Sequence, residues 1–275
     1  MSHYIKVDEN TQIFAQDWGS GKPLVFIPGW PFDHRCYEYQ FTQLTQRGFR
    51  CIGIDMRGFG KSDRPWGHYT YDVFADDIHK VLEQLKIKNA MLIGHSMGGA
   101  IALHYVARHG SQHVSQLALC GAAAPIWTQR PDYPYGFTKE TVNQMLDLCY
   151  SDRAQLLVNF GKDFFLTPTA LSPALSNWFH DIAMDGSPYA TAMCMIALRD
   201  TDLRSELAKI NIPTTILHGT LDKICPFEFA HQMHKGIKNS TLVPFEKSGH
   251  GLFYDEREKF NKTIIEKADH YLKNL

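Results

Sequence analysis

The sequence lacks an excess of charge of either sign. Its 28 Lys and Arg residues nearly balance its 29 Asp and Glu residues, which leaves a formal net charge of -1 at pH 7. A protein that holds a phosphate backbone or an anionic lipid surface needs a basic excess to neutralise that partner. We therefore expect neither a nucleic-acid partner nor a role at a membrane surface.

A long hydrophobic run is also missing. The longest apolar stretch, residues 117–127, is interrupted by Gly121 and Pro125, whereas crossing a bilayer takes roughly 18 consecutive apolar residues. Residues 1–8 lack the basic flank and the apolar segment of roughly 7–15 residues that make up a secretion signal. These absences predict a cytoplasmic protein with no membrane-spanning segment.

Closely paired cysteines are missing as well. The six cysteines form no C-x-x-C pair and are scattered at Cys36, Cys51, Cys120, Cys149, Cys194 and Cys225. This spacing favours reduced, mostly buried thiols over a disulfide framework or a zinc site. His231 and His234 share one face of a predicted helix but make only a weak metal site. We therefore expect no metal.

What the sequence does contain is enough apolar material for a large core, with 44% hydrophobic side chains among 275 residues. Short apolar runs bounded by turn residues alternate with longer amphipathic segments, which is typical of a mostly parallel sheet with crossover helices. The predicted strands are 4–7, 11–18, 24–27, 51–54, 90–93, 114–120, 214–217 and 241–243, and the predicted helices are 37–46, 71–85, 97–109, 227–235 and 256–272.

The alternation breaks between residues 125 and 201, where proline-separated helical patches replace the strand–helix rhythm. We interpret this segment as a helical cap inserted into a single core domain. The core is then made of residues 1–124 and 202–275.

One motif carries candidate chemistry. The predicted strand 90–93 runs into Gly94-His95-Ser96-Met97-Gly98 and then into a helix, which is the strand–turn–helix context of the G-x-S-x-G nucleophile elbow. Ser96 is the candidate nucleophile, and His95 is expected to pack beneath it. The alternative is a serine that merely caps a helix in a glycine-rich turn.

A serine hydroxyl needs a histidine to take its proton and a carboxylate to orient that histidine. Asp222 follows the strand 214–217, and His250 follows the strand 241–243. In a parallel sheet the loops at the carboxyl ends of the strands meet at one edge, so Ser96, Asp222 and His250 are expected to converge there. Asp200 and Asp202 are rival acids, although Asp202 precedes a short helical segment and is interpreted first as an N-cap.

Backbone amides should stabilise the developing negative charge as an oxyanion hole. One candidate is the amide of Met97, directly after Ser96, and the other is the amide of Trp30 in Pro28-Gly29-Trp30-Pro31. The alternative for this loop is a simple Pro-Gly turn. Gly60-Lys61-Ser62 resembles the end of a phosphate-binding loop, but Asp55 occupies the position of the earlier glycine that such a loop requires. The sequence also contains no dinucleotide-binding fingerprint. We therefore expect no cofactor.

With these motifs the sequence resembles the α/β-hydrolase family, and within it the cofactor-independent haloperoxidase, perhydrolase and aryl-esterase branch. The resemblance covers nearly the whole chain and includes Asp55-Met56-Arg57-Gly58-Phe59-Gly60, His218-Gly219-Thr220-Leu221-Asp222 and Ser248-Gly249-His250-Gly251. It implies an α/β-hydrolase fold with a helical cap, Ser96 as nucleophile, Asp222 as acid, His250 as base, and Trp30 and Met97 as oxyanion donors. Pro28 departs from the family, which usually has histidine there.

The resulting hypothesis is a serine hydrolase of the carboxylesterase or aryl-esterase type that cleaves small esters through an acyl-enzyme. Candidate pocket residues, which could equally pack the cap, are Trp127, Phe160, Phe164 and Trp178, with Phe165 and Met193. Two alternatives stay open. One is a perhydrolase or haloperoxidase in which peroxide replaces water, and the other is a sensor that binds a small molecule in the same pocket.

Overall fold

The computed structural model describes residues 1–166 and 171–272, with side chains described as far as Ala268. Its centre is an eight-stranded sheet in the order β1-β2-β4-β3-β5-β6-β7-β8. The strands are β1 (Ser2–Lys6), β2 (Gln12–Gly19), β3 (Lys22–Ile27), β4 (Phe49–Ile54), β5 (Ala90–His95), β6 (Val114–Cys120), β7 (Thr214–Gly219) and β8 (Ser240–Phe245). The hairpin β1–β2 and the pair β2–β4 are antiparallel, and the remaining pairs are parallel.

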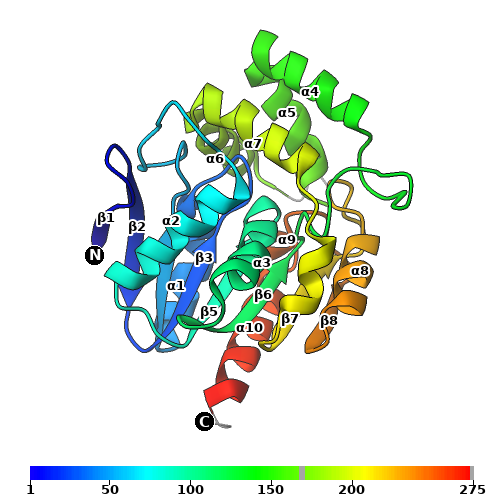
Figure 1. The fold of residues 1–275 in the computed structure, drawn as a ribbon. Coiled ribbons are helices and arrows are strands. Elements are labelled where there is room, and N and C mark those ends of the chain that lie inside the picture. Colours follow the sequence, from blue (N-terminus) through cyan, green and yellow to red (C-terminus); the bar gives the residue numbers. More distant parts are fainter. Residues whose placement is uncertain (167–170, 273–275) are drawn as a thin grey trace.

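Helices cover both faces of this sheet (Figure 1). Helix α1 packs against α10, while α2, α3, η3 and α8 form a second connected layer. Their bounds are η1 (His34–Tyr37), α1 (Glu38–Gln46), α2 (Tyr71–Gln84), α3 (Met97–His109), η3 (Arg204–Lys209), α8 (Glu228–Gly236), α9 (Leu252–Asp255) and α10 (Arg257–Leu272). This arrangement, a mostly parallel sheet between two layers of helices, confirms the predicted α/β-hydrolase fold class.

The central strands are buried along their whole length and mostly apolar for a physical reason. Every residue of β5, β6 and β7 is buried, because helices pack on both faces and neither face meets water. Helix α2 shows the complementary pattern, with Ile78, Val81 and Leu82 buried on one side and a side-chain cap from Thr70 at its start.

Four helices lie over the carboxyl edge of the sheet in Figure 1 and form what we call the cap: α4 (Lys139–Ser151), α5 (Arg153–Phe164), α6 (Pro173–Asp185) and α7 (Pro188–Asp200). The chain enters and leaves this region at one place, where Ile126 bridges Asp202 and the Leu203 amide donates to Pro125 O at 2.8 Å. All four helices fall inside the predicted insertion, of which residues 167–170 lie outside the described residues. The boundaries at 125 and 201 stay a prediction.

Two expectations drawn from absences can be compared with the structure. All six cysteines are free and buried, which confirms the prediction of reduced, buried thiols. Within the described residues, every helix is too short or too polar to cross a membrane.

Glycines permit the close crossing of β5, α3 and the end of β3. A Cβ on Gly98 would lie 2.4 Å from the backbone oxygens of both Ile27 and Pro28, and a Cβ on Gly94 would lie 2.3 Å from Gly98 O. Such distances are far inside van der Waals contact, and backbone cannot move aside as a flexible side chain can. The crossing therefore needs glycine at both positions.

Replacing Gly98 by alanine tests this crossing. We expect Gly98→Ala to lower the free energy of unfolding by about 1–3 kcal/mol or more, because the methyl group overpacks against backbone. Gly161 in α5 is a matched control, since a Cβ there would meet nothing within 4 Å. Gly161→Ala should raise the free energy of unfolding by up to about 1 kcal/mol through helix propensity. Urea denaturation of both variants measures the difference, and equal effects would contradict the argument.

Candidate functional site

Ser96 occupies a strained turn between β5 and α3. Its backbone has φ 54° and ψ -123°, a region that residues with a Cβ rarely adopt. The turn is held on both sides, because the Ser96 amide donates to Cys120 O at 3.0 Å and Ser96 O accepts from the Ala123 amide at 2.9 Å. The backbone geometry is that of a nucleophile elbow, in agreement with the sequence motif.

Asp222 and His250 are hydrogen bonded to each other. Asp222 lies after β7 and His250 after β8, and Asp222 Oδ2 is 2.7 Å from His250 Nδ1, with both side chains fully buried. The second carboxylate oxygen accepts from the amides of Ile224 at 2.9 Å and Cys225 at 2.8 Å. Burial opposes ionisation of Asp222, but attraction to His250 and these hydrogen bonds hold its pKa below the ordinary value. The carboxylate is therefore ionised at neutral pH.

The outer nitrogen of His250 is available. Because Nδ1 faces a carboxylate, it carries the proton in the neutral ring and leaves a lone pair on Nε2. Nε2 is buried and has no hydrogen-bond partner within the described part of the chain. A buried acceptor without a partner is costly in a folded protein. Its presence here indicates a position reserved for a proton donor.

Shared neighbours place Ser96 beside this pair. The Asp222 carboxylate accepts a hydrogen bond from the amide of Cys225, and the Ser96 side chain lies near enough to the Cys225 thiol to act on the pKa of that thiol, in the lowering direction. On the other side, His95 precedes Ser96, and its Nε2 lies 2.9 Å from His250 O. The structure therefore brings the three predicted residues to one edge of the sheet.

His95 has the supporting position predicted for it. Its ring lies 4.7 Å from the His250 ring, between centroids, and is fully buried. Burial, with repulsion from His250, lowers the pKa of His95 to about 3. His95 is thus neutral and acts as a hydrogen-bonding brace.

Two residues near Asp222 were missed by the sequence analysis. His218, on β7, lies 3.6 Å from Asp222 Oδ2 and 2.7 Å from Cys225 O, and burial lowers its pKa. Burial and the charge of Asp222 raise the pKa of Cys225 well above its ordinary value, so its thiol stays protonated and is no rival nucleophile. The position of Cys225 three residues after Asp222 is the one signal that pointed to it.

The two predicted oxyanion donors lie against the elbow. Met97 is the first residue of α3, where the backbone N–H has no intrahelical partner. The loop that carries Trp30 touches the nucleophile turn, since a Cβ on Gly29 would lie 2.7 Å from Ser96 Cβ. The Phe32 amide donates to Gly29 O at 2.8 Å and closes this loop. Its backbone is thus held without a histidine at Pro28.

The predicted aromatic pocket residues separate into two groups. Phe164 lies 5.3 Å from His250, and Phe160 lies 5.0 Å from Trp30, between ring centroids. Trp127 instead donates from Nε1 to Ile224 O at 3.1 Å and braces the Asp222 loop, while Trp178 contacts Phe179 at 5.1 Å. Phe160 and Phe164 are therefore the two that border the site.

A cavity of about 290 Å³ lies behind these two rings, between α5 and α6. Its lining is mostly apolar and includes Phe32, Phe160, Phe164, Phe165, Leu171 and Phe179. A cavity of this size and lining suits an apolar group of a small ligand.

The rival carboxylates are occupied elsewhere. Asp200 pairs with Arg199 and Lys139, at 2.7 Å and 3.2 Å. Asp202 accepts from the Arg204 amide at 3.0 Å and pairs with its guanidinium at 2.7 Å. The N-cap of η3 is Leu203, so Asp202 lies one residue before the N-cap and the prediction that Asp202 is the N-cap was wrong.

A second buried cluster contains Asp33, His34 and Asp55, whose ligand atoms lie within 4.8 Å of one another. Asp55 accepts from His34 Nδ1 at 2.6 Å, and Asp33 is bound by the Arg35 guanidinium. Arg35 continues outward to Asp185 at the end of α6, at 2.6 Å. These bonds give the cluster a structural role that joins the core to the cap.

Known proteins match this chain almost end to end. The family model for the alpha/beta hydrolase fold matches residues 22–257. The AB hydrolase superfamily protein YisY of Bacillus subtilis (strain 168) is 50% identical over 266 residues, which cover 97% of this chain and 98% of that protein.

Two solved structures share the architecture. An esterase (EaEST) from Exiguobacterium antarcticum is 46% identical, with a TM-score of 0.96 over 98% of this chain and 100% of that chain. A bromoperoxidase from Bacillus anthracis is 35% identical, with a TM-score of 0.92 over 96% of this chain and 98% of that chain. Fold, site geometry and similarity agree, and the chain belongs to the alpha/beta hydrolase fold family.

Proposed function

We propose that the protein is a serine hydrolase that cleaves small carboxylic esters through an acyl-enzyme. The observation that carries this proposal is the buried pair of Asp222 and His250, 2.7 Å apart, with His250 Nε2 left without a partner among the described residues. The hydroxyl oxygen of Ser96 attacks the ester carbonyl while His250 takes the hydroxyl proton. His250 then gives this proton to the leaving alcohol. Water, activated by the same imidazole, releases the acid.

The tetrahedral intermediate carries a negative charge on the former carbonyl oxygen. The amides of Met97 and Trp30 are the proposed donors to it, because they belong to the two turns that touch at Gly29 and Ser96. The start of α3 adds a favourable dipole at the same point. The similarity to the Exiguobacterium esterase supports ester hydrolysis.

The substrate is proposed to place its acyl group against Phe160 and Phe164. Both rings lie on α5 of the cap and separate Trp30 and His250 from the cavity of about 290 Å³. As long as these two rings keep their positions, only a small acyl group fits beside them. This favours short-chain or aryl esters.

Substitution of the proposed nucleophile and acid tests the mechanism. We expect Ser96→Ala and Asp222→Asn to lower kcat for p-nitrophenyl acetate by roughly 10⁴–10⁶-fold, because the residues act as one unit. Asp202→Asn is the matched control, since Asp202 pairs with Arg204, and it should stay within about threefold of the unsubstituted protein. Circular dichroism verifies the fold of each variant.

Either of two results would contradict the proposed hydrolase function. One is wild-type turnover by folded Ser96→Ala. The other is tight binding of esters without turnover by the unsubstituted protein, which would favour the sensor alternative.

Truncation of Phe160 tests the acyl pocket. We expect Phe160→Ala to shift preference from p-nitrophenyl acetate toward butyrate and hexanoate, because the gap beside Trp30 opens into the cavity. Each extra buried methylene contributes about 0.8 kcal/mol, or about fourfold in kcat/KM. Trp178→Ala is the control, since Trp178 contacts Phe179 rather than Trp30, and its chain-length profile should be unchanged. An unchanged profile in Phe160→Ala would place the acyl group elsewhere.

A second candidate function is perhydrolysis, in which hydrogen peroxide replaces water at the acyl-enzyme and yields a peracid. The 35% identical bromoperoxidase favours it. We expect bromination of phenol red in acetate buffer with peroxide and bromide, and its loss in Ser96→Ala. Absence of bromination by an enzyme that hydrolyses esters would limit the activity to hydrolysis.

A further inference from the structure

The last residue of α9, next to the turn into α10, carries a carboxylate that contacts both the cap and the loop of His250. Asp255 Oδ2 accepts from the Gly249 amide at 2.8 Å and from the Leu166 amide at 3.1 Å. Gly249 directly precedes His250, and Leu166 follows the end of α5. One oxygen atom therefore joins two segments that are far apart in sequence.

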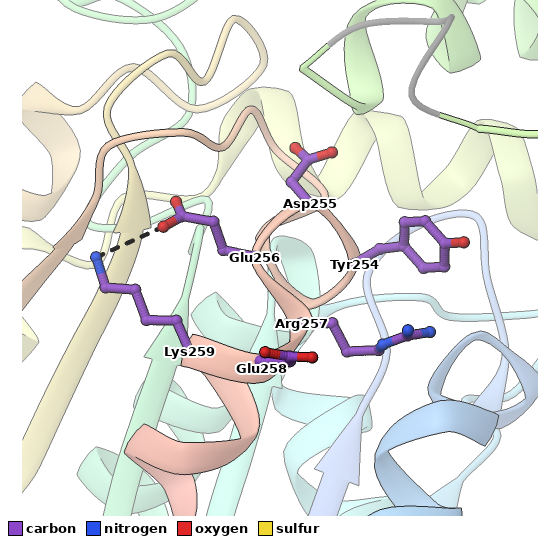
Figure 2. Close-up of a pocket in the computed structure, with 6 residues that line it drawn as sticks. All are labelled: Tyr254, Asp255, Glu256, Arg257, Glu258 and Lys259. Carbon is purple, nitrogen blue, oxygen red and sulfur yellow. Dashed lines mark ion pairs between the residues drawn. The ribbon is translucent and has the colours of Figure 1, made fainter.

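Figure 2 shows that the side chains of this turn diverge. Asp255 leaves the turn on the side of the cap, whereas Glu256 extends toward Lys259, 3.7 Å away. Glu256 also accepts from the Lys247 amide at 2.9 Å and from Ser248 Oγ at 2.8 Å. Glu256 thus fastens the start of the His250 loop to the core, and Asp255 adds the cap to the same loop.

The cap segment held by Asp255 borders the proposed active site. Phe164 and Phe165 immediately precede Leu166, and Phe164 packs edge-on against the His250 ring at 5.3 Å. A Cβ on Gly251 would lie 2.6 Å from a ring carbon of Phe165, and the Gly251 amide donates to Phe164 O at 2.7 Å. The cap and the base loop are therefore packed on both sides of His250.

We propose that Asp255 is a positioning residue for the hydrolase reaction, one that locks the cap to the loop of His250 while its carboxylate is ionised. The inference rests on the proposed function, because it assigns the loop held by Asp255 to the general base. Charge-assisted bonds to two amides are stronger than bonds to a neutral acceptor. Protonation of Asp255 loosens the lock and lets His250 and Phe164 leave their aligned positions.

The surroundings of Asp255 shift the pKa of its carboxyl group toward neutral pH, where enzyme activity can be measured. Burial raises the pKa of Asp255 to about 6, and the negative charges of Glu256 and Asp222 act in the same direction, while the two amides oppose them. Oδ1 is buried and unpartnered within the described residues. The ionisable groups on the surrounding elements include Asp163 of the cap, Asp222 and Lys223 after β7, Lys247 and His250 after β8, Tyr254 of α9, Glu256 after α9, and Arg257, Glu258 and Lys259 at the start of α10.

Kinetics of Asp255→Asn test the lock, with Glu258→Gln as the control. Asparagine keeps the shape and one acceptor but cannot ionise, and Glu258 is an exposed acid of the same turn. At pH 7.5 we expect Asp255→Asn to lower kcat/KM for p-nitrophenyl acetate roughly tenfold through misplacement of the base. In the unsubstituted protein and in Glu258→Gln, kcat/KM should fall as the pH is lowered through about 6, in addition to any fall caused by protonation of His250. Asp255→Asn should lack this additional fall.

Amide hydrogen exchange tests the lock without any substrate. After correction for intrinsic rates, protection of the Leu166 and Gly249 amides should rise about tenfold between pH 5 and pH 7.5 in the unsubstituted protein and in Glu258→Gln. It should not change in Asp255→Asn. This measurement keeps the inference separate from the proposed function, because it succeeds or fails whether or not Ser96→Ala abolishes esterase activity.

Thermal stability separates positioning from a plain structural role. Burial raises the pKa of Asp255 and the two amide bonds lower it. Burial of the charge therefore opposes global folding above about pH 6, whereas the two amide bonds are strengthened by ionisation as long as Asp255 stays buried. Asp255→Asn should then have a Tm at pH 7.5 at least as high as that of the unsubstituted protein. A lower Tm, with activity and protection reduced equally at every pH, would overturn the proposal. So would identical pH profiles and protection in Asp255→Asn and the unsubstituted protein.

Discussion

The buried hydrogen bond between Asp222 and His250 is the interaction on which the site depends. Without the carboxylate, the imidazole has no fixed tautomer and no fixed orientation. The bond forms only because β7 and β8 are neighbours and end together at one edge of the sheet. The parallel pairing of these two strands is thus what brings two loops that are distant in sequence together at one edge of the sheet.

The sequence predicted the parts of the site that local patterns encode. The turn at Ser96 needs a glycine on each side because the backbones of the strand and the helix touch where they cross. The two glycines, Gly94 and Gly98, can be recognised in the sequence. Asp222 and His250 were found because each follows an apolar run that ends at the same edge. The element bounds agreed to within a few residues for the same reason, since turns interrupt the apolar periodicity of every core strand.

The remaining features depend on contacts between distant segments. The spacing of Cys225 from Asp222 indicates that it lies near the carboxylate but not that it lies near Ser96, and His218 resembles an ordinary strand residue. Among the aromatic cap residues, the sequence could not separate Phe160 and Phe164 from Trp178, because their difference is which neighbour each ring faces. The carboxylate of Asp255 was invisible for the same reason, since its partners are backbone amides, which any residue supplies.

The outer attachment of the cap differs physically from the inner one. Arg35 and Arg64 both reach Asp185, whose side chain is 45% exposed, and exposed ion pairs are screened by salt over about 8–10 Å at ordinary ionic strength. The bonds around His250 are shielded from solvent and feel little of this screening. Dissolved ions therefore weaken the attachment of the cap at α6 more than its attachment near the end of α5.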